Sequence, residues 1–170
     1  MAPLSARIRQ FPQRRPWLAL AAAILAVELV GASGAVFTAQ GLGAWYSSLQ
    51  RPALAPPNWD FGPVWTLLFA LIGIAVWLVW QRYDETPGAA RVALLVFGVH
   101  FLFNLGWSAV FFGLREIGWG LVVIWVLWAL IVKTLWAFAR VDRRAALLLV
   151  PYLLWVSFAT YLNYQFWVLN

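Results

Sequence analysis

Five apolar runs, each close to 20 residues long, constrain the fold of this 170-residue chain more than any other feature. A helix needs about 20 apolar residues to cross the roughly 30 Å of hydrocarbon in a bilayer. The runs cover 17–37, 61–80, 92–112, 117–139 and 145–168. With 64% hydrophobic and 11% charged residues, the chain is also too apolar for a soluble domain of its size. The sequence therefore predicts an all-α integral membrane protein with five transmembrane helices.

The segments between these runs indicate how the helices are connected. Short turns join the last four runs, at 81–91, 114–116 and 140–144. Helices joined by such short turns are antiparallel neighbours, so we expect a bundle. No repeat or second domain is visible in the sequence. We therefore treat 17–170 as a single domain that follows a basic N-terminal extension, 1–16.

The distribution of basic residues predicts the orientation in the membrane. Nine arginines fall on the side of the N-terminus, namely Arg7, Arg9, Arg14, Arg15, Arg82, Arg91, Arg140, Arg143 and Arg144. The opposite side has Arg51 and Arg115. Loops rich in lysine and arginine stay on the cytoplasmic side. We expect a bacterial integral membrane protein with a cytoplasmic N-terminus and a C-terminus outside, while inner or outer membrane stays open.

The first run contains an acidic residue, Glu28. The run also follows a basic start, as in a secretory signal, but Glu28 interrupts it and no clear cleavage site is present, so we expect a span. An ionisable group inside a membrane helix is by default a candidate functional site. The alternative is a protonated or interface-facing carboxyl near the end of a tilted helix. The sequence leaves both interpretations of Glu28 open.

Few side chains are available for metal or acid/base chemistry. The chain has no cysteine, one histidine and one lysine, so we predict no metal site. The net charge of +6 comes from arginines at the ends of apolar runs rather than from a soluble basic domain. This placement argues against nucleic acid as a partner.

Polar and aromatic side chains form stripes on two of the predicted helices. At 100° per residue, one face of the third helix carries His100, Asn104, Trp107 and Phe111. A stripe on the fifth helix consists of Tyr152, Trp155, Ala159, Leu162, Asn163 and Phe166. Polar groups are costly in lipid, so both stripes should face the bundle interior. There they form either a site for a large, flat, mostly apolar ligand or simply helix-packing contacts.

The segment 45–59, WYSSLQRPALAPPNW, joins the first two runs, and we expect no regular helix through its middle. Its prolines lack the amide donor and push the preceding residues toward extended conformations. Polar backbone cannot face lipid, so this loop lies at the water interface or over the mouth of the bundle. Its rings, Trp45, Tyr46 and Trp59, suit an aromatic belt or a lid over a ligand cavity.

Several long motifs resemble those of one membrane protein family. They are WYSSLQRP, PPNW, GPVW, FNLGWSAVFFGLREIGWGL and VPYLLWVSFATYLNYQFWVLN. In this order and spacing they are similar to the translocator protein family, also called TspO, the peripheral benzodiazepine receptor or tryptophan-rich sensory protein. The resemblance covers roughly residues 30–170, and the 13 tryptophans of the chain agree with the last of these names.

The resemblance implies a five-helix bundle, often a homodimer, whose first loop caps a pocket between the helices. Members are reported to bind porphyrins, haem and related tetrapyrroles, and some bind sterols or aromatic drugs. The implied role is tetrapyrrole homeostasis or stress-responsive regulation. Light- and oxygen-dependent porphyrin degradation, or transport of tetrapyrroles or lipids, is the alternative. Porphyrin or haem is then a ligand rather than a required cofactor, and the partners are this ligand, the bilayer and a second copy.

The resemblance also implies ligand-binding positions. Matching positions of the family are Trp65, Asn104, Trp107, Trp119, Trp155 and Ala159. Trp155 is the candidate for photochemistry with bound porphyrin, because indole is the most readily oxidised side chain there. The stripes and the loop add further candidates, namely Trp45, Trp59, His100, Phe111 and Asn163.

The sequence departs from the family pattern at His100, at Leu54 and Ala55 of the loop, and at the C-terminal end. His100 stands where glutamine or asparagine is expected, and it can bond to a neighbouring helix, donate to a porphyrin carboxylate or ligate haem iron. The C-terminal YLNYQFWVLN has no lysine or arginine after its tyrosines, as the cholesterol-recognition pattern of animal members requires. Sterol binding through that pattern is therefore not expected.

Overall fold

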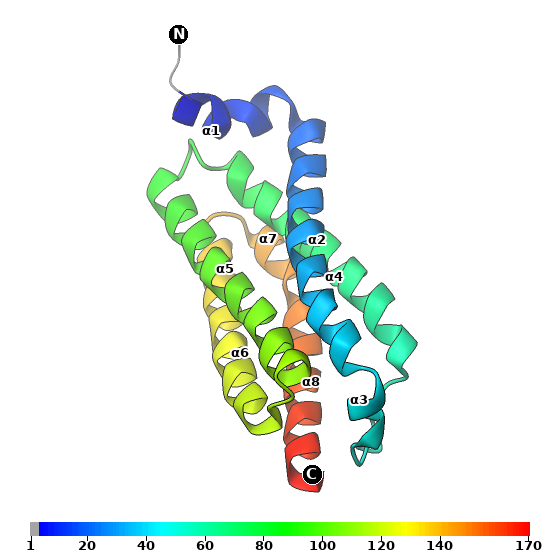
Figure 1. Cartoon of the computed structure of the whole chain (residues 1–170). Coiled ribbons are helices and arrows are strands. Elements are labelled where there is room, and N and C mark those ends of the chain that lie inside the picture. Colours follow the sequence, from blue (N-terminus) through cyan, green and yellow to red (C-terminus); the bar gives the residue numbers. More distant parts are fainter. Residues whose placement is uncertain (1–3) are drawn as a thin grey trace.

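Five long helices run along the molecule (Figure 1). The computed structural model describes residues 4–170. The long helices are α2 (Pro16–Gly41), α4 (Phe61–Gln81), α5 (Pro87–Ser108), α6 (Ile117–Ala139) and α8 (Val150–Leu169). Within the described residues, five helical segments are long and apolar enough to cross a membrane, and each of them contains one of these long helices. This confirms the predicted all-α fold with five spans.

Prolines mark where three of these helices begin. Pro16, Pro87 and Pro151 occupy the first or second position of α2, α5 and α8. In the first turn of a helix, the backbone N–H groups have no partner within the helix. A proline, which lacks this N–H, is therefore well tolerated there. Pro151 also divides the predicted fifth span into α7 (Arg143–Leu148) and α8, because it cannot continue the hydrogen bonding of the preceding turn.

The chain reverses tightly between α5 and α6. The last turn of α5 widens into the π-helical segment η2 (Ala109–Gly113), in which the amide of Leu114 donates to the carbonyl of Ala109 at 2.8 Å. Arg115 then adopts a φ of 61°, a left-handed conformation that non-glycine residues rarely take. The reversal brings Phe111 and Phe112, which are both buried, against the centre of the bundle.

The N-terminal extension forms a helix of its own, α1 (Leu4–Arg14), where the sequence predicts only a basic segment. In Figure 1, α1 lies across the end of α2. Its Phe11 stacks on Trp80 of α4 with 6.0 Å between the ring centroids. The side-chain amide of Gln13 donates to the carbonyl of Gln81 at 2.9 Å. These two contacts tie α1 to the end of α4.

Glycines allow the closest helix approaches. A Cβ at Gly73 of α4 would lie 2.6 Å from the Cα of Ile24 on α2. A Cβ at Gly31 of α2 would collide with the ring of Phe69 on α4. Around the bundle, α2 packs on α4 and α5, α6 packs on α5 and α8, and α7 packs on α4 and α6. The α2–α4 pair therefore depends on glycine on both sides.

Asp142 organises the turn between α6 and α7. Its carboxylate caps α7 by accepting from the amide of Arg144 at 2.8 Å, and it lies 3.9 Å from the Nε of Arg82 at the end of α4. Burial opposes its ionisation, but the hydrogen bonds from Arg144 and the charges of Arg144 and Arg82 outweigh burial and hold the pKa of Asp142 below its usual value. The turns that carry Arg82 and Asp142 lie at the same end of the bundle as α1 (Figure 1).

Candidate ligand-binding cavity

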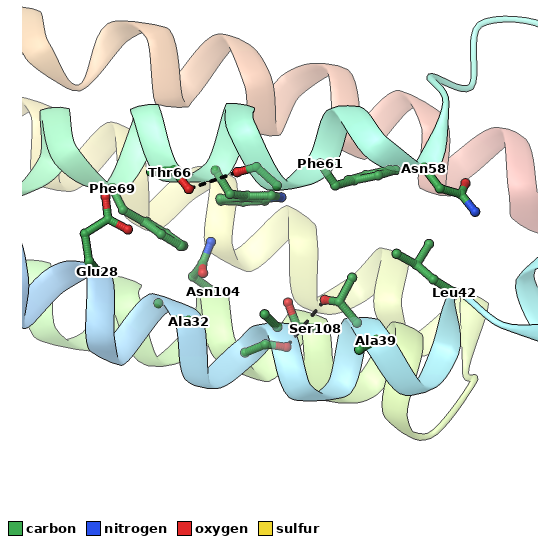
Figure 2. A pocket seen from close by; sticks show the side chains of 16 residues that line it. Glu28, Ala32, Ala39, Leu42, Asn58, Phe61, Thr66, Phe69, Asn104 and Ser108 are labelled. Carbon is green, nitrogen blue, oxygen red and sulfur yellow. Dashed lines mark hydrogen bonds between the residues drawn. The ribbon is translucent and has the colours of Figure 1, made fainter.

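A cavity of about 310 Å³ lies between α2, α4 and α5 (Figure 2). Sites for drug-sized ligands usually measure about 300–1,000 Å³. Its α4 wall is mainly aromatic, with the rings of Phe61, Trp65 and Phe69 beside Gly62 and Thr66. Its α2 wall consists mainly of small residues, including Gly31, Ala32, Gly34, Ala35 and Ala39. The cavity is therefore a slot between a wall of rings and a wall with few side-chain atoms.

Helical periodicity explains both walls. Phe61, Trp65 and Phe69 follow one another at intervals of four residues, so their rings stack along one face of α4. Residues 28, 31, 32, 35, 38, 39 and 42 share one face of α2 in the same way. The space remains open because alanine and glycine on one helix do not fill the gap that the large rings leave on the other.

Asn104 is the polar group that α5 contributes to the cavity together with Ser108. Its side-chain amide donates to the hydroxyl of Tyr152 on α8 at 2.9 Å, and both residues are buried. This bond fixes the orientation of the amide. Within residues 4–170, no described donor reaches the carbonyl oxygen of Asn104, so it can accept a hydrogen bond from a ligand.

One end of the cavity lies at the loop between α2 and α4. Figure 2 shows Leu42 and Asn58 at this end and Glu28 at the other. The loop contains α3 (Ala44–Ser48) and η1 (Asn58–Asp60). It is held on the end of α8 by the amide of Gln50, which donates to the side chain of Asn170 at 2.9 Å. The loop thus forms one boundary of the cavity.

The rings of the loop have different surroundings. Tyr46 is buried and lies 5.2 Å from Phe166 between ring centroids. Trp45 is half-buried, and its ring lies edge-to-face with that of Phe111, with 5.8 Å between the ring centroids. Trp59 is 74% exposed. Neither tryptophan lines the cavity between α2, α4 and α5.

The two predicted stripes do face each other, but their side chains fill most of the space between them. The indole N–H of Trp107 donates to Asn163 at 3.0 Å, and Asn163 donates to the carbonyl of Ile117 at 2.9 Å. A void of only about 30 Å³ remains there, lined in part by Trp107, Phe111, Ala159 and Asn163. Helix-to-helix hydrogen bonding thus accounts for the polar groups of this region.

His100 bonds to the neighbouring helix α6. Its Nδ1 lies 2.9 Å from the hydroxyl of Thr134, which itself donates to the carbonyl of Leu130 at 2.8 Å. Thr134 has therefore used its proton, so the Nδ1 of His100 is the donor. His100 is fully buried, and it lines neither the cavity between α2, α4 and α5 nor the void between the stripes. In this structure it therefore contributes to the packing of α5 on α6.

The two remaining tryptophans lie outside the cavity. Trp119, near the start of α6, is 66% exposed. Trp155 is half-buried on α8, with its ring 5.8 Å from that of Phe158. Among the predicted site residues, the cavity brings together Trp65 and Asn104. The sequence reasoning missed the α2 wall, although its run of small residues at helical spacing was a usable signal.

Residues 13–168 match the TspO/MBR family. The chain belongs to this family. It is 44% identical to the tryptophan-rich protein TspO of Chlorobaculum tepidum over 157 residues, which are 90% of this chain and 96% of that protein. It is 37% identical to the translocator protein of Homo sapiens over 153 residues, which are 89% of this chain and 90% of that one. The resemblance of the motifs is thus confirmed.

The match to the TspO/MBR family covers all five spans and the cavity, but little of α1. The tryptophan-rich sensory protein of Cereibacter sphaeroides is 36% identical over 126 residues, covering 74% of this chain and 77% of that one. Helix α1 ends at Arg14, whereas the matched residues begin at 13. Membership of the TspO/MBR family, together with the five apolar helices, identifies the chain as an integral membrane protein.

Proposed function

We propose that this TspO/MBR family protein binds a porphyrin or a related flat tetrapyrrole in the cavity between α2, α4 and α5. The observation that carries the proposal is the slot shape, with the rings of α4 opposite the small residues of α2. A macrocycle inserted into this slot stacks on Trp65 and buries apolar surface on both faces. The proposed role is tetrapyrrole homeostasis or its stress-responsive regulation.

The polar groups of the cavity support a defined orientation of such a ligand. Asn58 lies at the loop end of the cavity, where its side-chain amide can donate to a carboxylate that stays near water (Figure 2). Asn104 offers an acceptor farther inside. We place the end of the bundle that carries α1 on the cytoplasmic side, because it holds most of the arginines.

The proposal does not include light-dependent degradation of the porphyrin. Trp155, the candidate for that photochemistry, does not line this cavity. Its closest described aromatic neighbour is Phe158 on the same helix. A flat ligand in the slot contacts Trp65 instead, and the proposal is therefore one of binding.

A cavity-filling substitution tests the proposal. Ala35→Phe places a ring in the slot, so we expect the affinity for protoporphyrin to fall by at least about tenfold. The measurement is a dark titration of the detergent-solubilised protein, followed by the absorbance of bound porphyrin. Ala129→Phe makes the same change at an exposed position of α6 outside the cavity, and it should leave the affinity within about twofold. Equal affinities for Ala35→Phe and the unmodified protein would place the ligand elsewhere.

A further inference from the structure

The inner end of the cavity contains a carboxyl group. Glu28 lies near the middle of α2, about 18 Å from its first residue at 1.5 Å per residue. In Figure 2 its side chain extends from α2 toward α4, beside Phe69. Since α2 spans the membrane, this places the carboxyl close to the centre of the bilayer. It is half-buried and lines the cavity rather than one of the helix-packing seams.

Among the described residues 4–170, no protein group pairs with the carboxyl of Glu28. The residues that line the cavity include no lysine, arginine or histidine. In the described part of the chain, the ion pairs involve Arg82, Arg144, Glu85 and Asp142 at the basic end, and no hydrogen bond reaches the carboxyl of Glu28. An ionisable group at this depth is costly, and such groups usually pair with another charge or serve a ligand.

We infer that Glu28 determines ligand specificity, by selecting flat apolar molecules that bring a basic nitrogen to the inner end of the cavity. The inference rests on the proposed function, since it concerns the same cavity. A protonated nitrogen would form a charge-assisted hydrogen bond with the carboxylate in a site of low dielectric constant. A ligand carboxylate at the same place would find no positive partner, and an ionised Glu28 would repel it.

The same charge orients a ligand that has a carboxylate. Glu28 and Leu42 line opposite ends of the cavity, about 21 Å apart along α2 at 1.5 Å per residue. When ionised, Glu28 would repel a ligand carboxylate from the inner end, and donation by Asn58 at the loop end would act in the same direction. The carboxylates of a bound tetrapyrrole therefore point to the loop, and any basic nitrogen points inward.

A matched set of probes tests this inference. The probes are 9-(aminomethyl)anthracene, 9-methylanthracene and anthracene-9-carboxylate, which share one ring system and differ in charge. Their binding is followed by fluorescence with the full chain in phosphatidylcholine nanodiscs, and empty nanodiscs correct for partition into lipid. We expect the amine to bind at least about tenfold more tightly than the methyl probe, and the carboxylate more weakly than both.

Variants of Glu28 test whether the preference for the amine probe comes from the charge of this residue. In Glu28→Gln the amine and methyl probes should bind within about twofold of each other, whereas Glu28→Asp should keep most of the preference. Glu116→Gln removes an exposed carboxylate of the α5–α6 turn and should behave as the unmodified protein. Equal amine preference in Glu28→Gln and the unmodified protein would overturn the inference, as would the absence of any preference in the unmodified protein.

The protoporphyrin titration separates this inference from the proposed function. If protoporphyrin binds and Ala35→Phe weakens it while the anthracene probes show no charge preference, the cavity binds tetrapyrroles and the role of Glu28 is wrong. If the amine preference depends on Glu28 but protoporphyrin does not bind, Glu28 does select basic ligands in this cavity, and the proposed tetrapyrrole ligand is wrong.

Discussion

Replacing Gly73 with alanine is expected to lower the free energy of unfolding by about 2–3 kcal/mol. The added Cβ would lie 2.6 Å from the Cα of Ile24 and 3.1 Å from its backbone nitrogen. Backbone atoms cannot rotate away as a side chain can, so α2 and α4 must separate. The slot between these helices would also change width, and protoporphyrin should bind more weakly. Unfolding by a denaturing detergent, followed by tryptophan fluorescence, measures the stability.

Gly98→Ala is the matched control for Gly73→Ala. Gly98 lies inside α5, and a Cβ built there has no heavy atom within 4 Å apart from its own helix backbone and chain neighbours. Alanine favours a helix over glycine by up to about 1 kcal/mol, so this variant should be as stable as the unmodified protein or more stable. Equal losses of stability in the two variants would mean that α2 and α4 do not approach as closely as described.

Replacing Asn163 with leucine should destabilise the bundle by about 1–2 kcal/mol. Asn163 accepts from the indole of Trp107 on α5 and donates to the carbonyl of Ile117 at the start of α6, so it joins three helices. Leucine keeps a similar volume but leaves the buried indole N–H without a partner. The same detergent-induced unfolding measures the loss.

A double-mutant cycle isolates the bond between Trp107 and Asn163. Asn163→Leu combined with Trp107→Phe should show a coupling energy of about 0.6–1.7 kcal/mol, which are the average and the maximum for hydrogen bonds between membrane helices. The control pairs Asn163→Leu with Trp119→Phe, whose ring is largely exposed, and should show no coupling. If the first cycle also gives zero, the two stripes are held together by packing alone.

The positions of the five spans could be predicted from the sequence because apolar length is a local property. The predicted run 117–139 coincides with α6 (Ile117–Ala139). The predicted run 17–37 lies inside α2. This helix continues to Gly41, beyond the apolar stretch from which the run was predicted. Helix α1 was missed, because its stability depends on distant contacts such as Phe11 on Trp80.

The location of the cavity could be predicted only in part. Asn104 and Trp65 were among the predicted site residues, and both line the cavity. The sequence also placed Trp107 and Asn163 on facing stripes, but it could not show that their side chains bond to each other and occupy the space. Whether facing residues enclose a cavity or fill it depends on the combined volumes of side chains from three helices. The residue pattern of one helix does not give this information.

The most direct test of the central claim is a fluorine NMR titration that shows which tryptophans contact the ligand. The protein is labelled with 5-fluorotryptophan, and the resonances of Trp65, Trp119 and Trp155 are assigned with single Trp→Phe variants. On addition of protoporphyrin in the dark, we expect the Trp65 resonance to shift saturably, because the macrocycle stacks on that ring, while the resonances of Trp119 and Trp155 stay in place. An unchanged Trp65 resonance together with a shift of Trp155 would contradict a ligand site between α2, α4 and α5.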